Sequence, residues 1–451
     1  MTPTYPPGPA SPVLWQTWMY ARHRAQFLSE AARRYGDVFT VRVPPYARRL
    51  VVFSRPEHLR EIFAAAPADL HTGEANHVAA AWMGSGSMLV SDDDVHARLR
   101  RVLLPAFSVT AIEQYRQLVT DLASQETRGW TSGSVIATAE RMPGLTMDVI
   151  LQAVFGLTDA EQRAQLAPKL YQFTAIGPLT LLGLGTPALQ GIGPWKQFQR
   201  TEAALDALLY DEIGRRRLDP DLHARRDVLS RMVTAGTHGG TGVDAPLSDA
   251  EIRDQLVTLL LAGHETTAVA VAWALYELAA NPEVQATARR AAIDGDDKYL
   301  EAVIKESIRR RTVLGAIYRK LTRGVAIGGW DLPAGTVVTG SVLLAHQRPD
   351  SHPDPDVFRP ERHLDGSVPP HAWVPFGGGV RRCLGANLAL MQGTVTLREV
   401  LLRHRLALPG GARPDHARLR QITYVPARGA RVVVTALTDA PSSVRSEEAL
   451  R

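Results

Sequence analysis

The amino-acid sequence predicts a single domain over residues 1–451 that is mainly α-helical and carries a small β-rich lobe. Three observations support this fold class. Nearly every segment between residues 111 and 311 has apolar side chains at helical spacing. Runs of β-branched residues cluster near the N-terminus and return after residue 325. No internal repeat and no linker divides the chain, so we expect one large domain.

Near the N-terminus the pattern predicts a small sheet with a helix beside it. Residues 26–35 read as a helix that ends at Gly36, and residues 38–43 and 50–53 read as strands. Proline-rich residues 1–12, like residues 439–451 at the other end, are expected to be flexible. The first residues show no cationic start followed by an apolar run, so we expect no signal peptide or membrane anchor and a cytoplasmic protein.

The middle of the chain predicts a helical body, with residues 200–217 as one clear helix. Residues 177–194, rich in Gly, Pro and Leu, indicate either a mobile apolar loop over a hydrophobic pocket or a buried connection. Strands are expected at residues 325–327, 337–344 and 431–436, and a long helix at 384–405.

Composition narrows the class of protein. Hydrophobic residues make up 45% and charged residues 22% of the chain, as in a folded, soluble protein. The net charge of +5 is spread without a block of like charges, which disfavours a nucleic-acid partner. The single cysteine, Cys383, excludes a disulfide framework and a zinc site built on cysteine pairs, but one thiol can still bind a metal.

An apolar segment at residues 257–279 is long enough to span a bilayer, yet His264 and Glu265 stand near its middle. Ionisable side chains are costly in lipid, so a buried helix that carries a site is favoured. Ser248 and Glu251 predict a capping box at the start of this helix.

Residues 373–392 carry the strongest local signal, because Cys383 follows a glycine-rich turn and precedes a helix. The free amides and dipole at the start of a helix stabilise a thiolate, and glycines at 379 and 385 leave room for a flat group. An isolated cysteine is otherwise a small buried hydrophobic residue. A phosphate-binding loop is disfavoured, since no GK[ST] follows.

This segment resembles the F-x-x-G-x-R-x-C-x-G signature of cytochromes P450, through Phe376, Gly379, Arg381, Cys383 and Gly385. The resemblance covers most of the chain and implies the cytochrome P450 fold, a triangular helical body with a small β lobe. It implies haem b, iron protoporphyrin IX, as the cofactor. By position, Cys383 would bind the iron, Phe376 would pack near the sulfur, Arg381 would pair with a propionate, and Gly379 and Gly385 would border the haem.

The sequence Ala262-Gly263-His264-Glu265-Thr266-Thr267 resembles the oxygen-activating helix of the same family. There Thr266 would hydrogen-bond dioxygen, Glu265 would connect that hydroxyl to solvent protons, and Ala262 and Gly263 would leave space. Without the resemblance, the threonines are helix hydroxyls bonded to carbonyls and Glu265 is a surface charge.

Glu306 and Arg309 form an E-x-x-R pair, which in isolation is common and contributes little stability. The resemblance adds Arg362 and implies a buried structural triad that holds the cysteine loop. It also implies that His96, Arg100 and Arg319 contact haem propionates. A surface histidine on a basic helix is the alternative for His96.

Some positions depart from the family pattern. His352 and His363 replace aromatic residues, and residues 310–318 lack the customary proline, so their backbone course cannot be taken from the family. Residues expected to face the substrate are mostly apolar and therefore predict a hydrophobic small molecule: Met83, Met88, Thr258, Leu261, Ala262, Val313, Leu314 and Tyr424.

The resemblance implies a monooxygenase that hydroxylates or epoxidises its substrate with O2. The length leaves no room for a fused reductase, so the two electrons would come from a ferredoxin and its reductase, or from a flavodoxin-type donor, as in soluble bacterial members. A basic face at Arg98, Arg101, Arg381 and Arg382 would dock that donor, unless these are simply solvated charges.

A terpenoid of secondary metabolism is the favoured substrate, with a fatty acid or a polyketide or macrolide as alternatives. Two other activities remain open: a haem-thiolate enzyme that uses peroxide or no O2, and a non-catalytic haem sensor. Glu265 and Thr266 argue against the first, since such enzymes usually dispense with the acid–alcohol pair.

Overall fold

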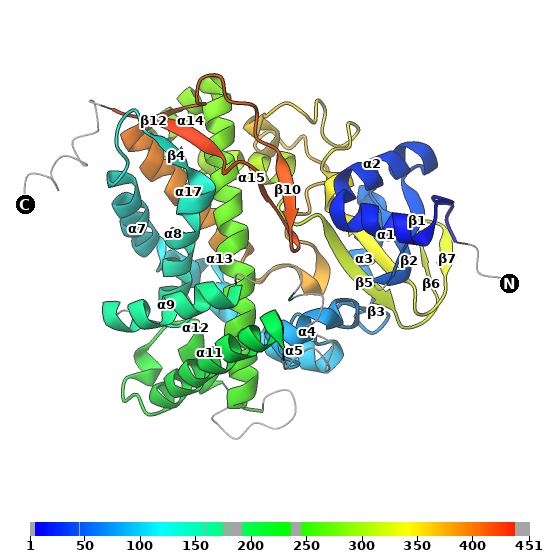
Figure 1. The fold of residues 1–451 in the computed structure, drawn as a ribbon, viewed down its shortest axis with the longest axis horizontal. Helices are drawn as coiled ribbons and strands as arrows, with labels where there is room; N and C mark the ends of the chain where they lie inside the picture. Colours follow the sequence, from blue (N-terminus) through cyan, green and yellow to red (C-terminus); the bar gives the residue numbers. More distant parts are fainter. Residues whose placement is uncertain are drawn as a thin grey trace, which may run out of the picture. The chain divides into compact units, whose positions relative to one another are not determined.

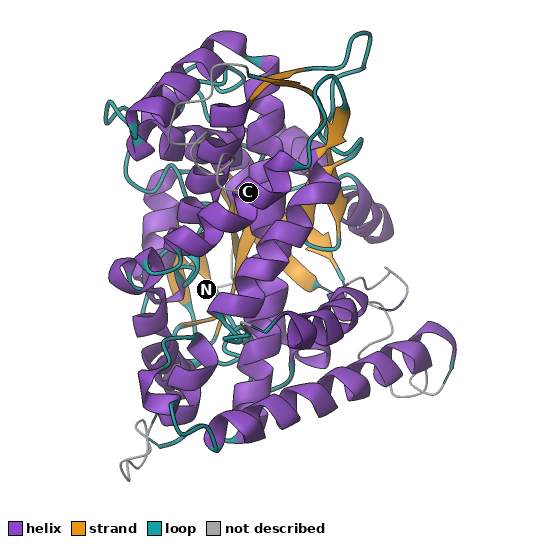
Figure 2. Ribbon diagram, turned by 90° about the vertical axis from the view of Figure 1, so that its left-hand side faces the viewer, coloured by secondary structure: helices purple, strands orange, loops and turns teal. Residues whose placement is uncertain are grey.

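The structure is a computed structural model that describes residues 5–437 apart from 45, 158, 175–179, 181–191 and 236–244. The chain forms two compact units, the first from residues 1–70, 116–146 and 265–451 and the second from 71–115 and 147–264. Helices make up most of the described chain (Figure 2), which confirms the mainly helical fold class. Each unit is built from separate segments, and the single domain stays a prediction.

A five-stranded sheet, which belongs to the first unit apart from His71 of its edge strand, has the order β1-β2-β8-β5-β3 (Figure 1). Its strands are β1 (Val38–Val43), β2 (Ala47–Phe53), β3 (Leu70–His71), β5 (Ala316–Leu321) and β8 (Val337–Ser341). β2 runs antiparallel to β1 and parallel to β8, with Val51 opposite Val338. Leu50 and Val52 enter one hydrophobic cluster, and Val51 and Phe53 enter another. Because alternate side chains of a strand point to opposite faces, a strand covered on both sides needs this continuous apolar run.

Three helices pack on this sheet: α1 (Val13–Arg22), α2 (Arg24–Tyr35) and α3 (Pro56–Ala64). The expected N-terminal elements are present, and Gly36 ends α2 at a φ of +86°. Residues 7–11, expected to be loose, are tied to this region. The Thr40 amide donates to the Pro7 carbonyl (3.0 Å), and the Gln16 side chain donates to the Ser11 carbonyl (2.8 Å).

The remaining strands form three small sheets in the first unit. They are β4 (Val135–Ala137), β12 (Arg431–Ala436) and β9 (His404–Ala407); β6 (Val325–Ile327) and β7 (Trp330–Leu332); and β10 (Ala417–Arg420) and β11 (Thr423–Pro426). The sequence did not predict β4 or β9, because each is short and exists through pairing with β12. The expected strand at 337–344 ends at Ser341, whose side chain accepts from the Leu344 amide (3.3 Å) and caps α16 (Val342–Ala345).

The other helices that lie wholly or partly in the first unit are α7 (Arg116–Arg128), α8 (Thr138–Ala153), α13 (Asp249–Ala280), α14 (Pro282–Asp294), α15 (Asp297–Arg310) and α17 (Ala386–Arg403). Their core includes Trp273, Ile304 and Leu397, all fully buried. Gly393 of α17 faces Ile304 so closely that a Cβ would lie 2.8 Å from its Cδ1. A glycine therefore lets α17 and α15 approach each other.

In the second unit the helices are α4 (Ala80–Met83), α5 (Asp93–Leu103), α6 (Val109–Glu113), α9 (Ala160–Thr174), α11 (Gly193–Arg217) and α12 (Val228–Thr234). Buried Arg216 of α11 donates to Glu212 (2.9 Å) and Asp227 (2.6 Å), which fixes α11 against α12. Short 3₁₀ turns occur in both units: Glu74–Ala79, Leu104–Phe107, Leu222–Ala224, Pro360–His363 and Gly379–Arg381. The apolar loop predicted at 177–194 lies almost wholly outside the described residues.

Helix α13 begins with the expected capping box. The Ser248 hydroxyl accepts from the Glu251 amide (3.2 Å), and the Glu251 carboxylate accepts from the Ser248 amide (2.9 Å). Among the described helices, α13 alone is long and apolar enough to cross a membrane, a weak criterion that core helices also meet. Since 72% of its most apolar window is buried in the protein, we interpret α13 as a core helix.

Candidate functional site

The loop that carries Cys383 is closed by backbone hydrogen bonds. The Cys383 amide donates to the Phe376 carbonyl (2.9 Å), the Arg382 amide to Gly379 (3.1 Å) and the Gly377 amide to Val374 (3.1 Å). Cys383 is exposed and forms no disulfide, and α17 begins three residues later. The loop therefore presents a thiol close to the positive end of a helix.

Two glycines of this loop adopt positive φ, +67° at Gly377 and +63° at Gly379. A Cβ at Gly379 would lie 2.2 Å from the Phe63 carbonyl oxygen at the end of α3. The space expected beside Gly379 is thus taken by Phe63, and this glycine allows the loop to pack on α3. At Gly385 a Cβ would meet no described atom within 4 Å, as expected for a position beside open space.

A chain of aromatic rings connects the cysteine loop to α15. The Trp373 ring meets the Phe376 ring edge to face, with 5.7 Å between the ring centroids. It meets the His363 ring in the same way at the same centroid distance. The Trp373 indole donates to the Lys305 carbonyl (3.2 Å). These contacts hold Phe376, whose carbonyl accepts from Cys383, against a buried helix.

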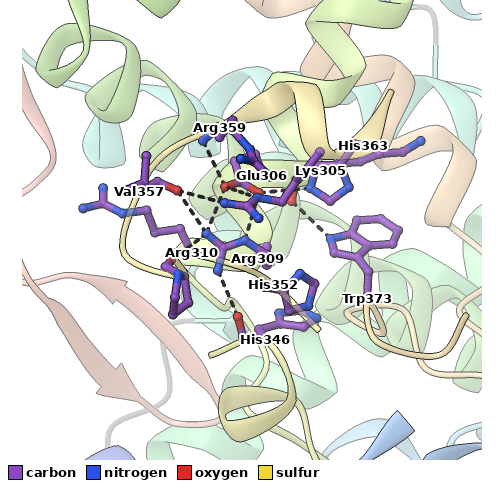
Figure 3. A network of polar contacts seen from close by, with 12 residues as sticks. Lys305, Glu306, Arg309, Arg310, His346, His352, Val357, Arg359, His363 and Trp373 are labelled. Atoms are coloured by element: carbon purple, nitrogen blue, oxygen red, sulfur yellow. Dashed lines mark hydrogen bonds and ion pairs between the residues drawn. The ribbon is translucent and has the colours of Figure 1, made fainter. Parts of the chain in front are cut away.

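Glu306 and Arg309, labelled in Figure 3, are fully buried and in contact with each other, and buried Arg362 also contacts Glu306. The Glu306 carboxylate accepts two hydrogen bonds from Arg309 (both 2.9 Å), one from Arg362 (3.0 Å) and one from the Arg359 amide (3.1 Å). Arg309 and Arg362 also donate to loop carbonyls, Arg309 to Pro355 at 2.7 Å and Arg362 to Pro353 at 3.0 Å. The structure thus brings the three predicted residues together around residues 353–363.

His363 is a fourth member of this cluster that sequence reasoning noted only as a departure. Its Nε2 lies 3.1 Å from Glu306 Oε2. Burial would raise the pKa of Glu306, but the hydrogen bonds from His363 and Arg309 lower it to about 2. The signal in the sequence was the replacement of an apolar ring by one that can donate a hydrogen bond.

Two more histidines are buried near this cluster, His346 and His352 (Figure 3). His346 Nε2 accepts from the Val374 amide (3.1 Å), and Arg309 donates to the His346 carbonyl (2.9 Å). Burial lowers the pKa of His352 to about 4 and that of His346 well below its usual range. Both rings are therefore neutral at physiological pH.

Arg319 of β5 and Arg381 of the cysteine loop line one small cavity together with Ile62 and Phe63. Arg319 is buried, and its guanidinium donates to the Tyr318 carbonyl (2.8 Å). Two guanidinium groups that border one cavity, far apart in sequence, fit an anionic group such as a carboxylate.

Glu265, where α13 enters the first unit, forms an ion pair with Arg420 at the end of β10. Sequence reasoning missed Arg420, since 155 residues separate the partners. The Glu265 side chain is 22% exposed, and Thr266 beside it is half-buried. Both predicted proton-handling residues are thus partly accessible on an otherwise buried helix.

The proline-free segment at 310–318 runs along β11 before it becomes β5. The Tyr424 amide donates to the Val313 carbonyl (2.8 Å), and Leu314 forms a β-bridge with Thr423. A Cβ at Gly315 would lie 2.8 Å from the Tyr424 ring, so a glycine permits this approach. Tyr424 is buried, its hydroxyl has no hydrogen-bond partner among the described residues, and burial raises its pKa to about 12.

The other predicted substrate residues lie in the second unit. The Met88 amide donates to the Gln255 side chain (2.9 Å), and Thr258 donates to Ser87 (2.6 Å), so residues 87–88 lie against α13. Met83 and Thr258 are buried, Met88 and Leu261 are half-buried, and Ala262 is exposed. The space expected at Gly263 is not free, because a Cβ there would lie 2.8 Å from Ile150.

His96 and Arg100 stand one turn apart on α5 of the second unit. His96 is buried and Arg100 half-buried, which excludes a freely exposed surface histidine. Arg98 of the same helix donates to the Ala245 carbonyl (3.3 Å) and forms an ion pair with Glu251. Its charge is compensated within the unit, so Arg98 is a poor member of the expected docking face.

Comparisons with known proteins identify the family. The cytochrome P450 family matches residues 6–430. Cytochrome P450 135A1 of Mycobacterium tuberculosis is 49% identical over 95% of both chains. Cytochrome P450 135B1 of Mycobacterium bovis is 39% identical over 96% of this chain and 92% of its own. The chain belongs to the cytochrome P450 family.

Solved structures show the same fold. The retinoic acid bound cyanobacterial CYP120A1 has a TM-score of 0.82 at 22% identity, over 97% of this chain and 100% of that chain. The cytochrome P450DA heme domain has a TM-score of 0.79 at 23% identity, over 97% of this chain and 99% of that chain. The family match and the relatives identify the protein as a cytochrome P450 monooxygenase, an enzyme class whose cofactor is haem and which uses O2, a redox partner and a hydrophobic substrate.

Proposed function

We propose that this protein inserts one atom of O2 into a C–H or C=C bond of a hydrophobic small molecule, with Cys383 as the iron ligand. The second oxygen atom leaves as water, which consumes two electrons and two protons. The observation that carries the proposal is the exposed Cys383 thiol on a loop whose Trp373 packs against Phe376 and against His363 of the Glu306 cluster. Such support holds a ligand in place before the cofactor binds.

The residues present fit a haem. Within the first unit, an exposed thiol for the iron and two arginines on one small cavity provide the donor set, with Arg319 and Arg381 directed to propionate carboxylates. His96 and Arg100 of the second unit remain part of this proposal for the propionates, and Phe376 and Gly385 for the haem border. When bound, the haem iron supplies the activation of O2.

Glu265 and Thr266 move protons in this proposal. The Thr266 hydroxyl holds a proton on the active-site side of α13, and Glu265 exchanges protons with solvent through its exposed edge. Arg420 keeps the Glu265 carboxylate in one orientation. The acid and alcohol together favour an O2-dependent oxygenase over an enzyme that uses peroxide or a haem sensor.

The substrate we favour is a terpenoid of secondary metabolism. Support comes from the apolar character of Met83, Leu261, Ala262, Val313 and Leu314, which matches a ligand with few polar groups. Fatty acids and polyketide or macrolide skeletons share this property and are the alternatives. The names of the relatives state no substrate.

For electron supply we propose a separate ferredoxin with its reductase, or a flavodoxin-type donor. Arg382 is exposed next to Cys383, where a cation attracts an acidic electron carrier close to the thiol. We further propose a cytoplasmic enzyme, in line with the burial of α13 inside the protein.

Two measurements test the activity. The reduced protein should give the thiolate-type CO spectrum, and its absence would overturn the role of Cys383. With a reductase pair and a turned-over substrate, Thr266→Ala should divert electrons to hydrogen peroxide while NADPH is still consumed. Thr267→Ala, a neighbour on the same helix, is the matched control and should keep product formation coupled.

The substrate class is tested by optical titration of the ferric protein with a sesquiterpene, a diterpene, a medium-chain fatty acid and a macrolide aglycone. A saturable low-to-high-spin shift with a terpenoid supports the favoured class. A shift with only the fatty acid or the macrolide assigns the alternative instead.

A further inference from the structure

Helix α1 exposes three large apolar side chains and buries a polar one. Leu14, Trp15 and Trp18 are 83%, 45% and 53% exposed, whereas Gln16 is completely buried. Single exposed apolar residues are ordinary, but three large ones within five positions of one short helix form a patch. A tryptophan side chain that stays exposed often contacts a partner, because burial of its large apolar surface contributes much binding or folding free energy.

The orientation of α1 is fixed by hydrogen bonds. The Gln16 side chain donates to the Pro9 (3.0 Å) and Ser11 (2.8 Å) carbonyls and accepts from the Arg42 amide of β1 (2.9 Å). On the inner face, Tyr20 shares a 2.5 Å hydrogen bond with Tyr318. These bonds hold α1 beside β1 (Figure 1) and turn the apolar residues outward.

The same region carries a concentrated positive charge. Residues 5–55 contain eight arginines and two acids, although the whole chain has a net charge of only +5. Both acids are already paired, Glu30 with Arg33 and Asp37 with Arg348. Five exposed arginines have no ion pair among the described residues: Arg22, Arg34, Arg42, Arg48 and Arg49. Arg22 is the last residue of α1, and Arg42 lies in β1, which packs against α1, so uncompensated positive charge accompanies the apolar patch.

We propose that α1 docks the protein on an anionic lipid bilayer, with Leu14, Trp15 and Trp18 inserted at the headgroup level. Tryptophan and leucine on an exposed helix face are typical of helices that lie in a membrane interface, and α1 adds Arg22 at its end. Arginines near the surface attract anionic headgroups. A second copy of this chain is a poor occupant, since two such basic regions repel each other.

This inference goes beyond the proposed function and does not depend on it. The proposed contact with the membrane is peripheral, because α1 is too short to span a bilayer. The contact does not involve the core helix α13. The apolar patch supplies insertion and the arginines supply attraction, so binding should need both anionic lipid and low salt.

The test is co-sedimentation of the full-length holoprotein with phosphatidylglycerol vesicles and with phosphatidylcholine vesicles. We expect binding to the first, weak binding to the second, and loss of binding in high salt. The double variant Leu14→Ser/Trp18→Ser should bind phosphatidylglycerol vesicles about tenfold more weakly or worse. Leu218→Ser removes an apolar side chain of matched exposure, 85%, from the second unit and should change nothing.

Far-UV circular dichroism and the CO spectrum of each variant verify folding, so lost binding cannot be mistaken for unfolding. The proposal is overturned if the wild type does not sediment with phosphatidylglycerol vesicles, or if the double variant binds them equally well. It is also overturned if the wild type forms a dimer that the double variant does not form. The patch would then be a protein interface.

Discussion

Replacement of Glu306 by glutamine tests the buried cluster that ties residues 353–363 to α15 and, through His363, contacts Trp373 before the cysteine loop. The carboxylate accepts hydrogen bonds from the side chains of Arg309, Arg362 and His363 and from the Arg359 amide. Glutamine has nearly the same shape, but one oxygen becomes an NH2 group that cannot accept from these donors. The two guanidinium groups also lose their counter-charge in a site without water exposure.

The loss of folding stability expected for Glu306→Gln follows from the pKa of Glu306. Its ordinary value is 4.5 and its value in the protein is about 2, a difference equivalent to about 3 kcal/mol of folding free energy. Removal of one partner from a buried ion pair typically costs about 3–5 kcal/mol, in agreement. Because the folded pKa lies below the unfolded one, the wild type loses this stability as the pH falls from about 4.5 to 2. The variant has no such loss in this range.

The assay is urea unfolding of the full-length protein at pH 7, followed by far-UV circular dichroism. Glu301→Gln is the matched control on the same helix, since Glu301 pairs with Lys305 (2.6 Å) at the surface. That exposed pair should contribute no more than about 0.5 kcal/mol. If Glu306→Gln and Glu301→Gln lowered the free energy of unfolding to within about 1 kcal/mol of each other, the buried-cluster argument would be wrong.

Three further predictions concern single residues of the first unit. Gly379→Ala places a methyl group 2.2 Å from a carbonyl oxygen of α3 at positive φ and should cost about 1–3 kcal/mol in urea unfolding; Gly411→Ala, with a similar φ of +69° and no atom within 4 Å, should cost only about 1 kcal/mol. Wild-type stability should fall as the pH drops from about 6.5 to 4, because His352 takes up a proton in the unfolded chain and not in the folded one. Thermal melts at both pH values should show a smaller drop for His352→Gln, and an equal drop would exclude this ring as the cause. Arg420→Gln should change stability by less than about 1 kcal/mol, since its ion pair with Glu265 is partly exposed. It should nevertheless lower the product formed per NADPH, and unchanged coupling would remove Arg420 from the proton pathway.

Local sequence signals determined much of the fold. The helix at 24–35 ends where Gly36 can adopt positive φ, and the capping box at Ser248 begins α13 as expected. The signature around Cys383 predicted the family that the comparisons then showed. These features depend on neighbouring residues, whose spacing is visible in one sequence.

Local patterns gave no sign of the features that depend on tertiary contacts. Strands β4 and β9 are short and form only because β12 lies between them. The course of residues 310–318 depends on the bridge from Leu314 to β11 and on the pairing of residues 316–318 with β8.

The sequence also did not predict which charged side chains pair with each other or which apolar side chains stay exposed. Arg420 reaches Glu265 across 155 positions, and His363 becomes a donor to Glu306 only because the chain folds back onto α15. The outward orientation of Trp15 and Trp18 depends on the bonds made by buried Gln16. The sequence alone therefore determined the family and its signature residues, because short spacings encode them. The tertiary structure decided which distant charges meet and which apolar faces stay exposed, because those depend on how remote segments pack.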